Sequence, residues 1–322
     1  MPRCAVNGAR LHYERHGRGE PVLLVTGFAI SGAVFEPVLG AYTDRFECIL
    51  YDHRGTGRSG GPARPTSIPQ LAADAAGLLA ALGVESAHVH GVSMGGMVAQ
   101  ELALRFPHRV RGLVLGATTP GGPRAARPAA GELAALLAAA VDGRRGEWLA
   151  GALFSEAFRH EHPQRVRELL AYFGRHPPSR AAVLAQWWAT VYHDTTSRLG
   201  QIRAPTLVVH GDADTLTPVA NARMLAARIP GAELALVPGA GHAYALEQPE
   251  VTHRLVCDWF ERRGPIPAGA PRTGLTARAE PLTRPFGLPV GAARTGASLA
   301  VLAADRVKDR LRGRSADVAV DR

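Results

Sequence analysis

Short apolar runs recur along roughly the first 260 residues and are separated by segments of helical pattern. Six of them have the length and composition of buried strands: residues 22–26, 47–51, 87–90, 113–117, 205–210 and 233–237. Segments such as 68–82 and 221–229, between these runs, are predicted helices. Asn7-Gly8 separates two further short runs and is the two-residue signal of a β-hairpin. Alternating strands and helices predict an α/β fold with a mostly parallel sheet, helices on both faces and the functional site at the carboxyl ends of the strands.

The strand pattern stops between residues 118 and 200, where helical periodicity takes over. Eight of the nineteen aromatic residues lie in this insertion: Trp148, Phe154, Phe158, Tyr172, Phe173, Trp187, Trp188 and Tyr192. We therefore expect a core domain made of residues 1–117 and 201–262, interrupted by a helical domain at 118–200. Most of the eight aromatic side chains are expected to pack these helices together.

Residues 263–322 form a basic tail of different composition. The part up to Pro289 is rich in Pro, Gly, Arg and Thr, as flexible linkers are. Residues 291–313 have the pattern of an amphipathic helix, with Leu and Val opposite Arg, Lys and Asp. Docking of this segment onto the core domain, onto a partner protein or onto an anionic membrane surface is open, beside a mostly disordered extension.

The charge distribution argues against a nucleic-acid partner. Residues 262–322 hold twelve Lys or Arg against five Asp or Glu, a net +7 of the chain's +9, which leaves +2 for the rest. No secretory signal pattern and no run of 18 apolar residues appears. Cys4, Cys48 and Cys257 lack metal or redox spacing and indicate free thiols. We expect a cytoplasmic protein without a metal.

The stretch 89–96, Val-His-Gly-Val-Ser-Met-Gly-Gly, carries the clearest chemical signal. It follows a predicted strand and precedes a predicted helix, which is the context of a G-x-S-x-G nucleophile elbow. The turn is so tight that a side chain on Gly91 or Gly95 would collide with the neighbouring strand or helix. Ser93 is then the candidate nucleophile, and the Met94 amide at the helix N-terminus can donate to a developing oxyanion.

A serine nucleophile needs a base and a group that orients the base. In this architecture an acid and then a histidine follow, each in a loop after a later strand. The run 205–210 leads into Asp212 and Asp214, and the run 233–237 leads into His242 between glycine- and alanine-rich residues. Both partner types therefore occur in the expected order.

Two choices remain within these loops. Asp212 directly follows its strand and is expected to bond the backbone of its own turn, whereas Asp214 lies far enough out to reach an imidazole. We choose Asp214 as the acid. Of the thirteen histidines, His242 is the candidate base, because it lies in a glycine-flanked loop after the last strand. His90 and His210 close buried strands and are expected to be core residues or neighbours of the site.

These motifs resemble the alpha/beta-hydrolase superfamily, in the branch of 3-oxoadipate enol-lactonases, small esterases and cofactor-free haloperoxidases. The resemblance spans about residues 6–262 and also includes 25–28 (Val-Thr-Gly-Phe) and 51–59 (Tyr-Asp-His-Arg-Gly-Thr-Gly-Arg-Ser). It implies a sheet of eight strands, no cofactor, and a serine hydrolase with Ser93, Asp214 and His242 as its triad. The implied oxyanion donors are the amides of Phe28 and Met94.

The resemblance has one departure and one added expectation. Where the family has His-Gly after its third strand, this chain has Thr26-Gly27, which puts the support of the oxyanion loop in question. Asp52 and Arg54 are expected to be scaffold residues beside the elbow. The helical insertion lies where the family places a cap over the nucleophile, and one or two of its aromatic residues, Trp187 or Trp188 first, are expected to line the pocket.

The predicted function is hydrolysis of a small apolar or aromatic ester or lactone through an acyl-enzyme intermediate. Two alternatives stay open. The same triad could serve a carbon–carbon bond hydrolase or a perhydrolase, or the fold could be a non-catalytic ligand receptor. No dinucleotide fingerprint or phosphate loop is present in the sequence to indicate a cofactor.

Overall fold

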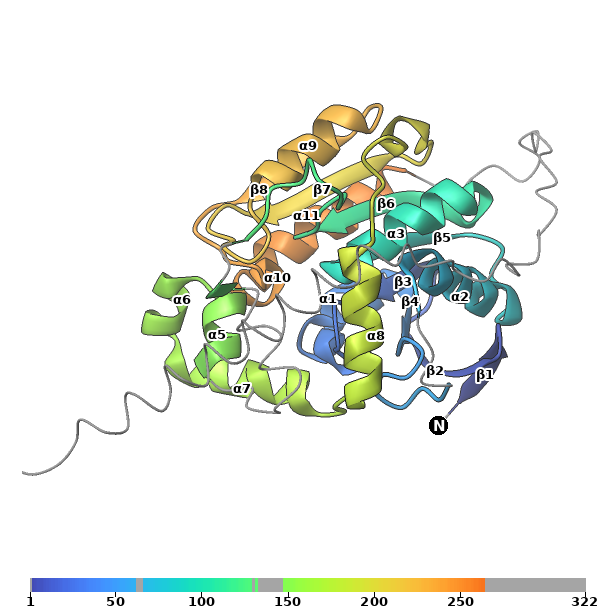
Figure 1. Ribbon diagram of the computed structural model, residues 1–322, viewed down its shortest axis with the longest axis horizontal. Coiled ribbons are helices and arrows are strands. Elements are labelled where there is room, and N and C mark those ends of the chain that lie inside the picture. The colour runs from blue at the N-terminus through green and yellow to red at the C-terminus, as the bar shows by residue number, and fades with distance from the viewer. Residues whose placement is uncertain (1, 62–65, 129–130, 133–146, 264–322) are drawn as a thin grey trace, which may run out of the picture. The chain divides into compact units, whose positions relative to one another are not determined.

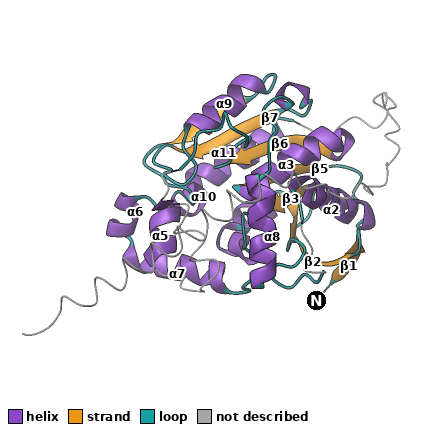
Figure 2. Ribbon diagram, viewed as in Figure 1, coloured by secondary structure: helices purple, strands orange, loops and turns teal. Residues whose placement is uncertain are grey.

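The computed structural model describes residues 2–61, 66–128, 131–132 and 147–263. Its sheet has eight strands in the order β1-β2-β4-β3-β5-β6-β7-β8. They are β1 (Arg3–Val6), β2 (Ala9–His16), β3 (Glu20–Val25), β4 (Phe46–Tyr51), β5 (Ala87–Val92), β6 (Val110–Gly116), β7 (Thr206–Gly211) and β8 (Glu233–Val237). The strands from β4 to β8 pair in parallel, and β1 and β2 are antiparallel at one edge (Figures 1 and 2). The predicted α/β fold is confirmed.

The helices outside the insertion lie between consecutive strands or, in the case of the last two, after β8. They are η1 (Gly32–Val38), α1 (Gly40–Thr43), α2 (Ile68–Ala81), α3 (Met94–Arg105), η2 (Pro107–Arg109), η3 (Leu199–Gln201), α9 (Ala220–Arg228), α10 (Tyr244–Glu247) and α11 (Pro249–Glu261). Local signals explain several boundaries. The hairpin turns at Asn7 and Gly8, both with positive φ, as a two-residue turn that matches the strand twist requires. Ser67 caps α2 by accepting from the Gln70 amide at 3.2 Å.

Alternate residues of the central strands point to opposite faces of the sheet, so each face has its own apolar cluster. In β3, Leu23 and Val25 belong to the cluster that contains α2, α3 and α9 residues. Val22 and Leu24 belong to the cluster that contains α1 and α11 residues. The central strands are therefore buried on both sides, which is why they appear in the sequence as continuous apolar runs rather than as alternating patterns.

In the described part of the insertion, residues 118–128 and 192–198 are not helical, and an isolated bridge joins Gly121 to Asp194 between these two stretches. Its helices are α5 (Glu147–Leu153), α6 (Glu156–Glu161), α7 (Pro163–Gly174) and α8 (Arg180–Val191). Helices α5 and α7 contribute to the cluster on the α1 and α11 side of the sheet, while α8 contributes to the opposite cluster. In Figure 1, α5, α6 and α7 form a group and α8 lies apart from them.

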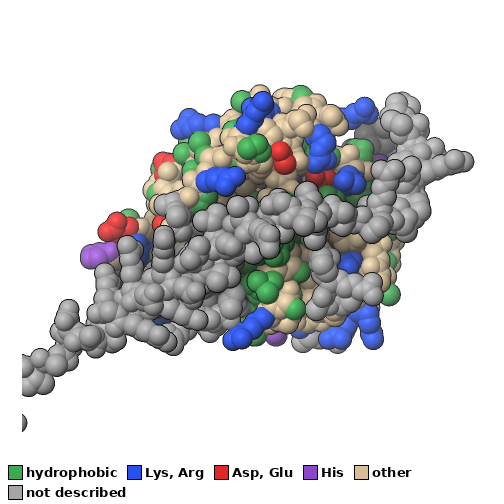
Figure 3. Space-filling model, viewed as in Figure 1, with side chains coloured by type: hydrophobic (Ala, Val, Ile, Leu, Met, Phe, Trp, Pro, Cys, Tyr) green, Lys and Arg blue, Asp and Glu red, His purple; other side chains and the backbone are tan. Residues whose placement is uncertain are grey.

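The remaining expectations concern the tail, membrane-spanning helices, the cysteines and the basic side chains. The basic tail, with its linker and the helix at 291–313, is not among the described residues. Within the described part, no helix has the length and apolar character needed to cross a bilayer. The three cysteines are unpaired. On the face seen in Figure 3, the basic side chains of the described residues are scattered rather than gathered into a stripe.

Candidate active site

Ser93 occupies a strained turn between β5 and α3. Its φ of 59° and ψ of −123° are unusual for a residue with a side chain. A strained backbone of this kind is kept only where contacts with the surrounding structure hold it in place. The Ser93 amide donates to the Gly116 carbonyl at 2.9 Å, and Thr118 Oγ1 donates to the Ser93 carbonyl at 2.7 Å. The backbone on both sides of the turn is therefore fixed to β6 and the residues after it.

The glycines around the turn are required by contact distances. A Cβ on Gly91 would lie 2.3 Å from the Gly95 carbonyl oxygen, and a Cβ on Gly95 would lie 2.1 Å from the Val25 carbonyl oxygen. Both distances are far shorter than a carbon–oxygen contact. A Cβ on Gly27 would lie 3.3 Å from Ser93 Cβ, so the loop after β3 runs directly beside the serine. The predicted collision at both flanking positions is confirmed.

The loops after β7 and β8 bring an aspartate and a histidine together. Asp214 Oδ2 accepts a hydrogen bond from His242 Nδ1 at 2.9 Å, and Asp214 Oδ1 accepts from the Thr217 amide at 2.8 Å. His210 Nε2, which lies 2.7 Å from the Thr217 carbonyl oxygen, is also 3.1 Å from Asp214 Oδ2. The Asp214 side chain is fully buried.

Burial alone would raise the pKa of the Asp214 carboxyl. The charge of His242 and the hydrogen bonds from His210 and His242 oppose burial and outweigh it, so that the pKa is lowered to about 2. Asp214 is therefore an ionised acceptor at neutral pH. It holds His242 with its Nδ1 proton toward the carboxylate, which leaves Nε2 available as a base.

Asp212 has a different position. Its side chain is exposed, and Oδ1 accepts from the Gly239 amide at 2.6 Å. Asp212 thus bonds the loop after β8, and the expectation that it bonds the backbone of its own turn is wrong. Of the two aspartates, only Asp214 contacts His242 among the described residues.

Ser93 and His242 both line one cavity of about 980 Å³, counting the solvent in its mouth. Apart from these two residues, its walls are almost entirely apolar: Thr26, Gly27, Phe28, Ala29, Ile30, Val34, Phe35, Val38, Val92, Leu149, Leu153, Phe173, Leu216, Ala243, Tyr244, Ala245 and Leu246. Within the described chain, Ser93 Oγ and His242 are not joined by a hydrogen bond. Such contacts are often long in unliganded sites and shorten when substrate binds.

The amides of Phe28 and Met94 flank the serine. Met94 is the first residue of α3, and Phe28 lies in the loop after β3. Both residues are buried. Neither amide has a protein acceptor among the described hydrogen bonds. Within the part of the chain that the structure describes, both amides are therefore free of protein acceptors, as their predicted role as oxyanion donors requires.

Trp187 and Trp188, the predicted substrate contacts, are not among the residues that line the described cavity, and their contact with substrate stays a prediction. Trp187 packs edge-on against the Phe28 ring, with 6.2 Å between ring centroids, and Trp188 stacks on exposed Tyr192. The orientation of α8 explains this: the helix turns Gln186, which is 1% exposed, toward the interior, and the two tryptophans next to it point in other directions. The insertion contributes Leu149, Leu153 and Phe173 to the cavity instead.

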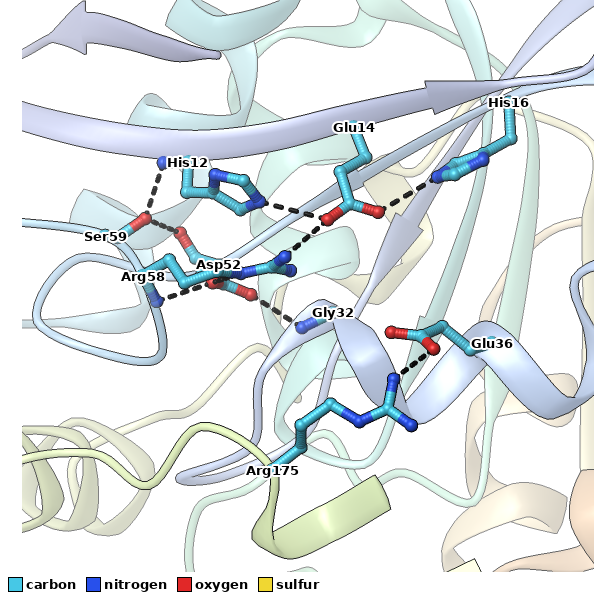
Figure 4. Close-up of polar contacts among 9 residues, drawn as sticks. All are labelled: His12, Glu14, His16, Gly32, Glu36, Asp52, Arg58, Ser59 and Arg175. Carbon is cyan, nitrogen blue, oxygen red and sulfur yellow. Dashed lines mark hydrogen bonds and ion pairs between the residues drawn. The ribbon is translucent and has the colours of Figure 1, made fainter. Parts of the chain in front are cut away.

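Asp52 and Arg54 lie in a hydrogen-bond network beneath the loops, in agreement with their expected scaffold role. Asp52 Oδ1 accepts from the Gly32 amide, and Oδ2 accepts from the Arg58 amide, both at 2.7 Å (Figure 4). Arg54 forms two hydrogen bonds to Asp74, at 2.5 and 2.6 Å. The Asp52–Gly32 bond fixes the start of η1, whose residues Val34, Phe35 and Val38 line the cavity.

Glu14 extends this network to the antiparallel edge of the sheet. It accepts from His12 Nε2 at 3.1 Å, His16 Nε2 at 3.0 Å and Arg58 at 2.5 Å (Figure 4). Burial raises the pKa of its carboxyl, but the bonds from His16, His12 and Arg58 together lower it to about 2. Figure 4 also shows Arg175, just after α7, paired with Glu36 of η1.

Two residues that sequence reasoning missed connect the insertion to the site. Gln186 bonds the Ala29 amide and Thr56. Glu247 accepts from the Ser155 amide at 2.8 Å and from the Gly241 amide at 3.0 Å, next to His242. A signal for Gln186 was present, because it shares the helical spacing of the apolar residues Ala182, Val183 and Ala189. The sequence contained no comparable signal for Glu247.

No group of three or more His, Cys, Asp or Glu side chains able to hold a metal ion occurs among the described residues. At or next to the cavity, the described chain places the Ser93 hydroxyl, the His242–Asp214 pair and backbone amides, beside the hydroxyls of Thr26 and Tyr244. This set can support nucleophilic attack by a hydroxyl, proton transfer and stabilisation of an oxyanion.

Comparison with known proteins agrees with this architecture. Residues 20–249 match the family model of the alpha/beta hydrolase fold, and the chain belongs to this family. A protein of Azorhizobium caulinodans, provisionally named carbamate hydrolase RutD, is 35% identical over 267 residues, which cover 80% of this chain and 97% of that protein.

Two solved structures connect the fold to ester and lactone chemistry. A thermophilic esterase from Thermogutta terrifontis has a TM-score of 0.70 and 28% identity, covering 82% of this chain and 99% of the esterase. An enol-lactonase from Burkholderia xenovorans LB400 has a TM-score of 0.70 and 26% identity, covering 81% and 100%. The resemblance inferred from the motifs is confirmed, and the chain is a hydrolase of this fold.

Proposed function

We propose that this protein is a serine hydrolase that cleaves a carboxylic ester or lactone of a small apolar molecule. The observation that carries the proposal is the buried Asp214–His242 pair, which opens on the same cavity as Ser93 in its strained turn. The likeness to an esterase and an enol-lactonase supports the reaction class.

In the proposed mechanism, His242 Nε2 takes the Ser93 proton as Ser93 Oγ attacks the substrate carbonyl. The amides of Phe28 and Met94 donate to the oxygen that becomes negative in the tetrahedral intermediate. Collapse of that intermediate expels the alkoxide, which takes the proton from His242 and leaves an acyl group on Ser93. Water then attacks the acyl carbon, with His242 again as base, and the acid is released.

The substrate class follows from the cavity walls. Among the described residues that line the cavity there is no Asp, Glu, Lys or Arg, and four of them are aromatic: Phe28, Phe35, Phe173 and Tyr244. Burying apolar substrate surface against such walls contributes about 25 cal/mol per Å², while an anionic substrate would lose hydration without gaining a partner. We therefore propose a neutral substrate with an alkyl or aromatic acyl portion.

The relative provisionally named a carbamate hydrolase makes a carbamate the second candidate. The same nucleophile and base would serve, and the leaving group would differ. The apolar walls favour a neutral carbamate ester over the small carbamate anion.

One panel tests these candidates together. Wild type and Ser93→Ala are assayed on p-nitrophenyl esters of increasing acyl length, aliphatic lactones, neutral carbamate esters, vinylogous diketones and peracid formation. We expect turnover of esters or lactones that rises with acyl length and disappears in Ser93→Ala. Turnover of carbamates or diketones alone would replace the ester assignment, and a wild type inactive on every substrate would remove it.

A further inference from the structure

Two consecutive residues of α8 hold the loop after β3. Gln186 Oε1 accepts the hydrogen bond of the Ala29 amide at 2.8 Å. The next residue, Trp187, packs edge-on against the ring of Phe28. A helix of the insertion thus contacts both the backbone and the side chain of the segment that contains the Phe28 amide.

This segment needs outside support. Ala29 has a φ of 58°, in the left-handed region that residues with a side chain rarely adopt, and it is only 4% exposed. Two other hydrogen bonds hold the ends of the loop: Thr26 Oγ1 donates to the Ile30 carbonyl and His53 Nε2 lies against the Thr26 carbonyl, both at 3.2 Å. Neither bond reaches the peptide between Phe28 and Ala29.

The Gln186 carboxamide is itself fixed in one orientation. Its Nε2 donates to Thr56 Oγ1 at 2.6 Å, and both side chains are fully enclosed. Helix α8 approaches this part of the core closely, since a Cβ on Gly55 would lie 3.2 Å from Ala182 Cβ. With the nitrogen committed to Thr56, the oxygen faces the Ala29 amide.

We propose that Gln186 is a positioning residue for the oxyanion hole, acting through the Ala29 amide on the backbone of Phe28. The Ala29 N–H lies in the plane of the Phe28–Ala29 peptide. The Cα of Phe28 also lies in this plane, and the Phe28 amide nitrogen is bonded to that Cα. Fixing the plane therefore restricts the direction of the Phe28 amide. This inference rests on the proposed function, because it assigns a task to the amide that function uses.

The inference also answers the question raised by Thr26 in the sequence. Thr26 itself holds only the ends of the loop, through its bond to the Ile30 carbonyl. Support for the Phe28–Ala29 peptide comes from the helical insertion, through a side chain on the buried face of α8. Helix α8 is then part of the catalytic apparatus as well as of the cover over the sheet.

Gln186→Met tests this role, since it keeps the side-chain length and removes the acceptor. We expect kcat on a p-nitrophenyl ester to fall by about 10- to 100-fold, because a small displacement of one oxyanion donor has effects of this size. KM should change by less than about threefold, because the cavity walls are untouched. The Ki of an alkyl trifluoromethyl ketone, whose serine adduct carries an oxyanion, should rise by the same factor by which kcat falls.

Gln100→Met is the matched control. Gln100 is equally buried, donates to the Thr119 carbonyl at 3.1 Å and accepts from Thr195 Oγ1 at 2.6 Å. This variant loses the same kinds of contact at a place that does not touch the loop after β3. We expect a lower melting temperature, with kcat and the ketone Ki within about threefold of wild type.

Equal kinetic effects in Gln186→Met and Gln100→Met, or an unchanged ketone Ki in Gln186→Met, would overturn the inference. Should the methionine variant not fold, Gln186→Glu carries the test, since its carboxylate still accepts from the Ala29 amide. Its ketone Ki should stay within about threefold of wild type, and a tenfold increase would count against the role. A wild type without ester or lactone turnover would instead refute the proposed function.

Discussion

Replacing Asp214 with asparagine tests the assignment of the acid in detail. In the wild type, Oδ1 accepts from the Thr217 amide and Oδ2 accepts from His242 Nδ1. The Thr217 amide can only donate, so the asparagine oxygen must face it and the NH₂ group must face His242. Nδ1 then has to accept, which places the imidazole proton on Nε2, where it blocks removal of the Ser93 proton.

We expect Asp214→Asn to lower kcat by about 10⁴-fold, the size of effect that the wrong tautomer has in Ser-His-Asp enzymes. This corresponds to about 5.5 kcal/mol of lost transition-state stabilisation. Asp212→Asn is the matched control, because its side-chain oxygen can still accept from the Gly239 amide, and its kcat should stay within a few-fold. The assay is initial-rate hydrolysis of a p-nitrophenyl ester, with circular dichroism to verify folding.

The reasoning would be refuted by the reverse ranking of the two variants. It would also be refuted by a folded Asp214→Asn variant that keeps more than about a tenth of wild-type kcat, since the tautomer argument leaves no room for such activity.

Three further predictions concern stability and the tail. Because the pKa of Asp214 is lowered to about 2, its carboxylate contributes about 2 kcal/mol to the free energy of unfolding above pH 4, and this contribution is lost as the pH falls toward 2. Urea unfolding of wild type as a function of pH should show the loss, and Asp214→Asn should not. Equal pH dependence of the two proteins would contradict the prediction. Gly95→Ala should lower the free energy of unfolding by about 2 kcal/mol or more, because its Cβ would collide with the Val25 carbonyl. Gly151→Ala, whose Cβ would meet nothing within 4 Å, should stabilise the protein slightly. Calorimetric unfolding of both variants measures these changes. Deleting residues 265–322 should leave kcat within a few-fold, and a loss to background would show that the tail supports the catalytic domain.

The strands, the hairpin and the elbow could be predicted because their signals are local. A strand buried on both faces is a continuous apolar run, and the elbow requires small residues at Gly91 and Gly95 wherever it occurs. Boundaries differ by a few residues: the run 87–90 is the first part of β5, which continues to Val92 and so ends directly before Ser93. The order of acid and histidine followed from the order of the loops.

The sequence could not predict which face of a helix turns inward. Trp187 and Trp188 are adjacent, so their directions differ by about 100°, and composition cannot say which one faces the cavity. In α8 the neighbouring Gln186 faces inward and Trp187 packs against Phe28. Glu247 could not be found either, because its partners, Ser155 and Gly241, lie 92 and 6 residues away and no local pattern links them.

The most direct test of the central claim is to locate the nucleophile chemically. The protein is treated with an alkyl fluorophosphonate, and the adduct is mapped by peptide mass spectrometry in wild type, His242→Ala and Asp212→Asn. Activation of Ser93 by His242 predicts one adduct, on Ser93, that forms rapidly in wild type and Asp212→Asn and at least about a hundredfold more slowly in His242→Ala. An unlabelled Ser93 in the folded wild type, or equal labelling rates with and without His242, would contradict the account.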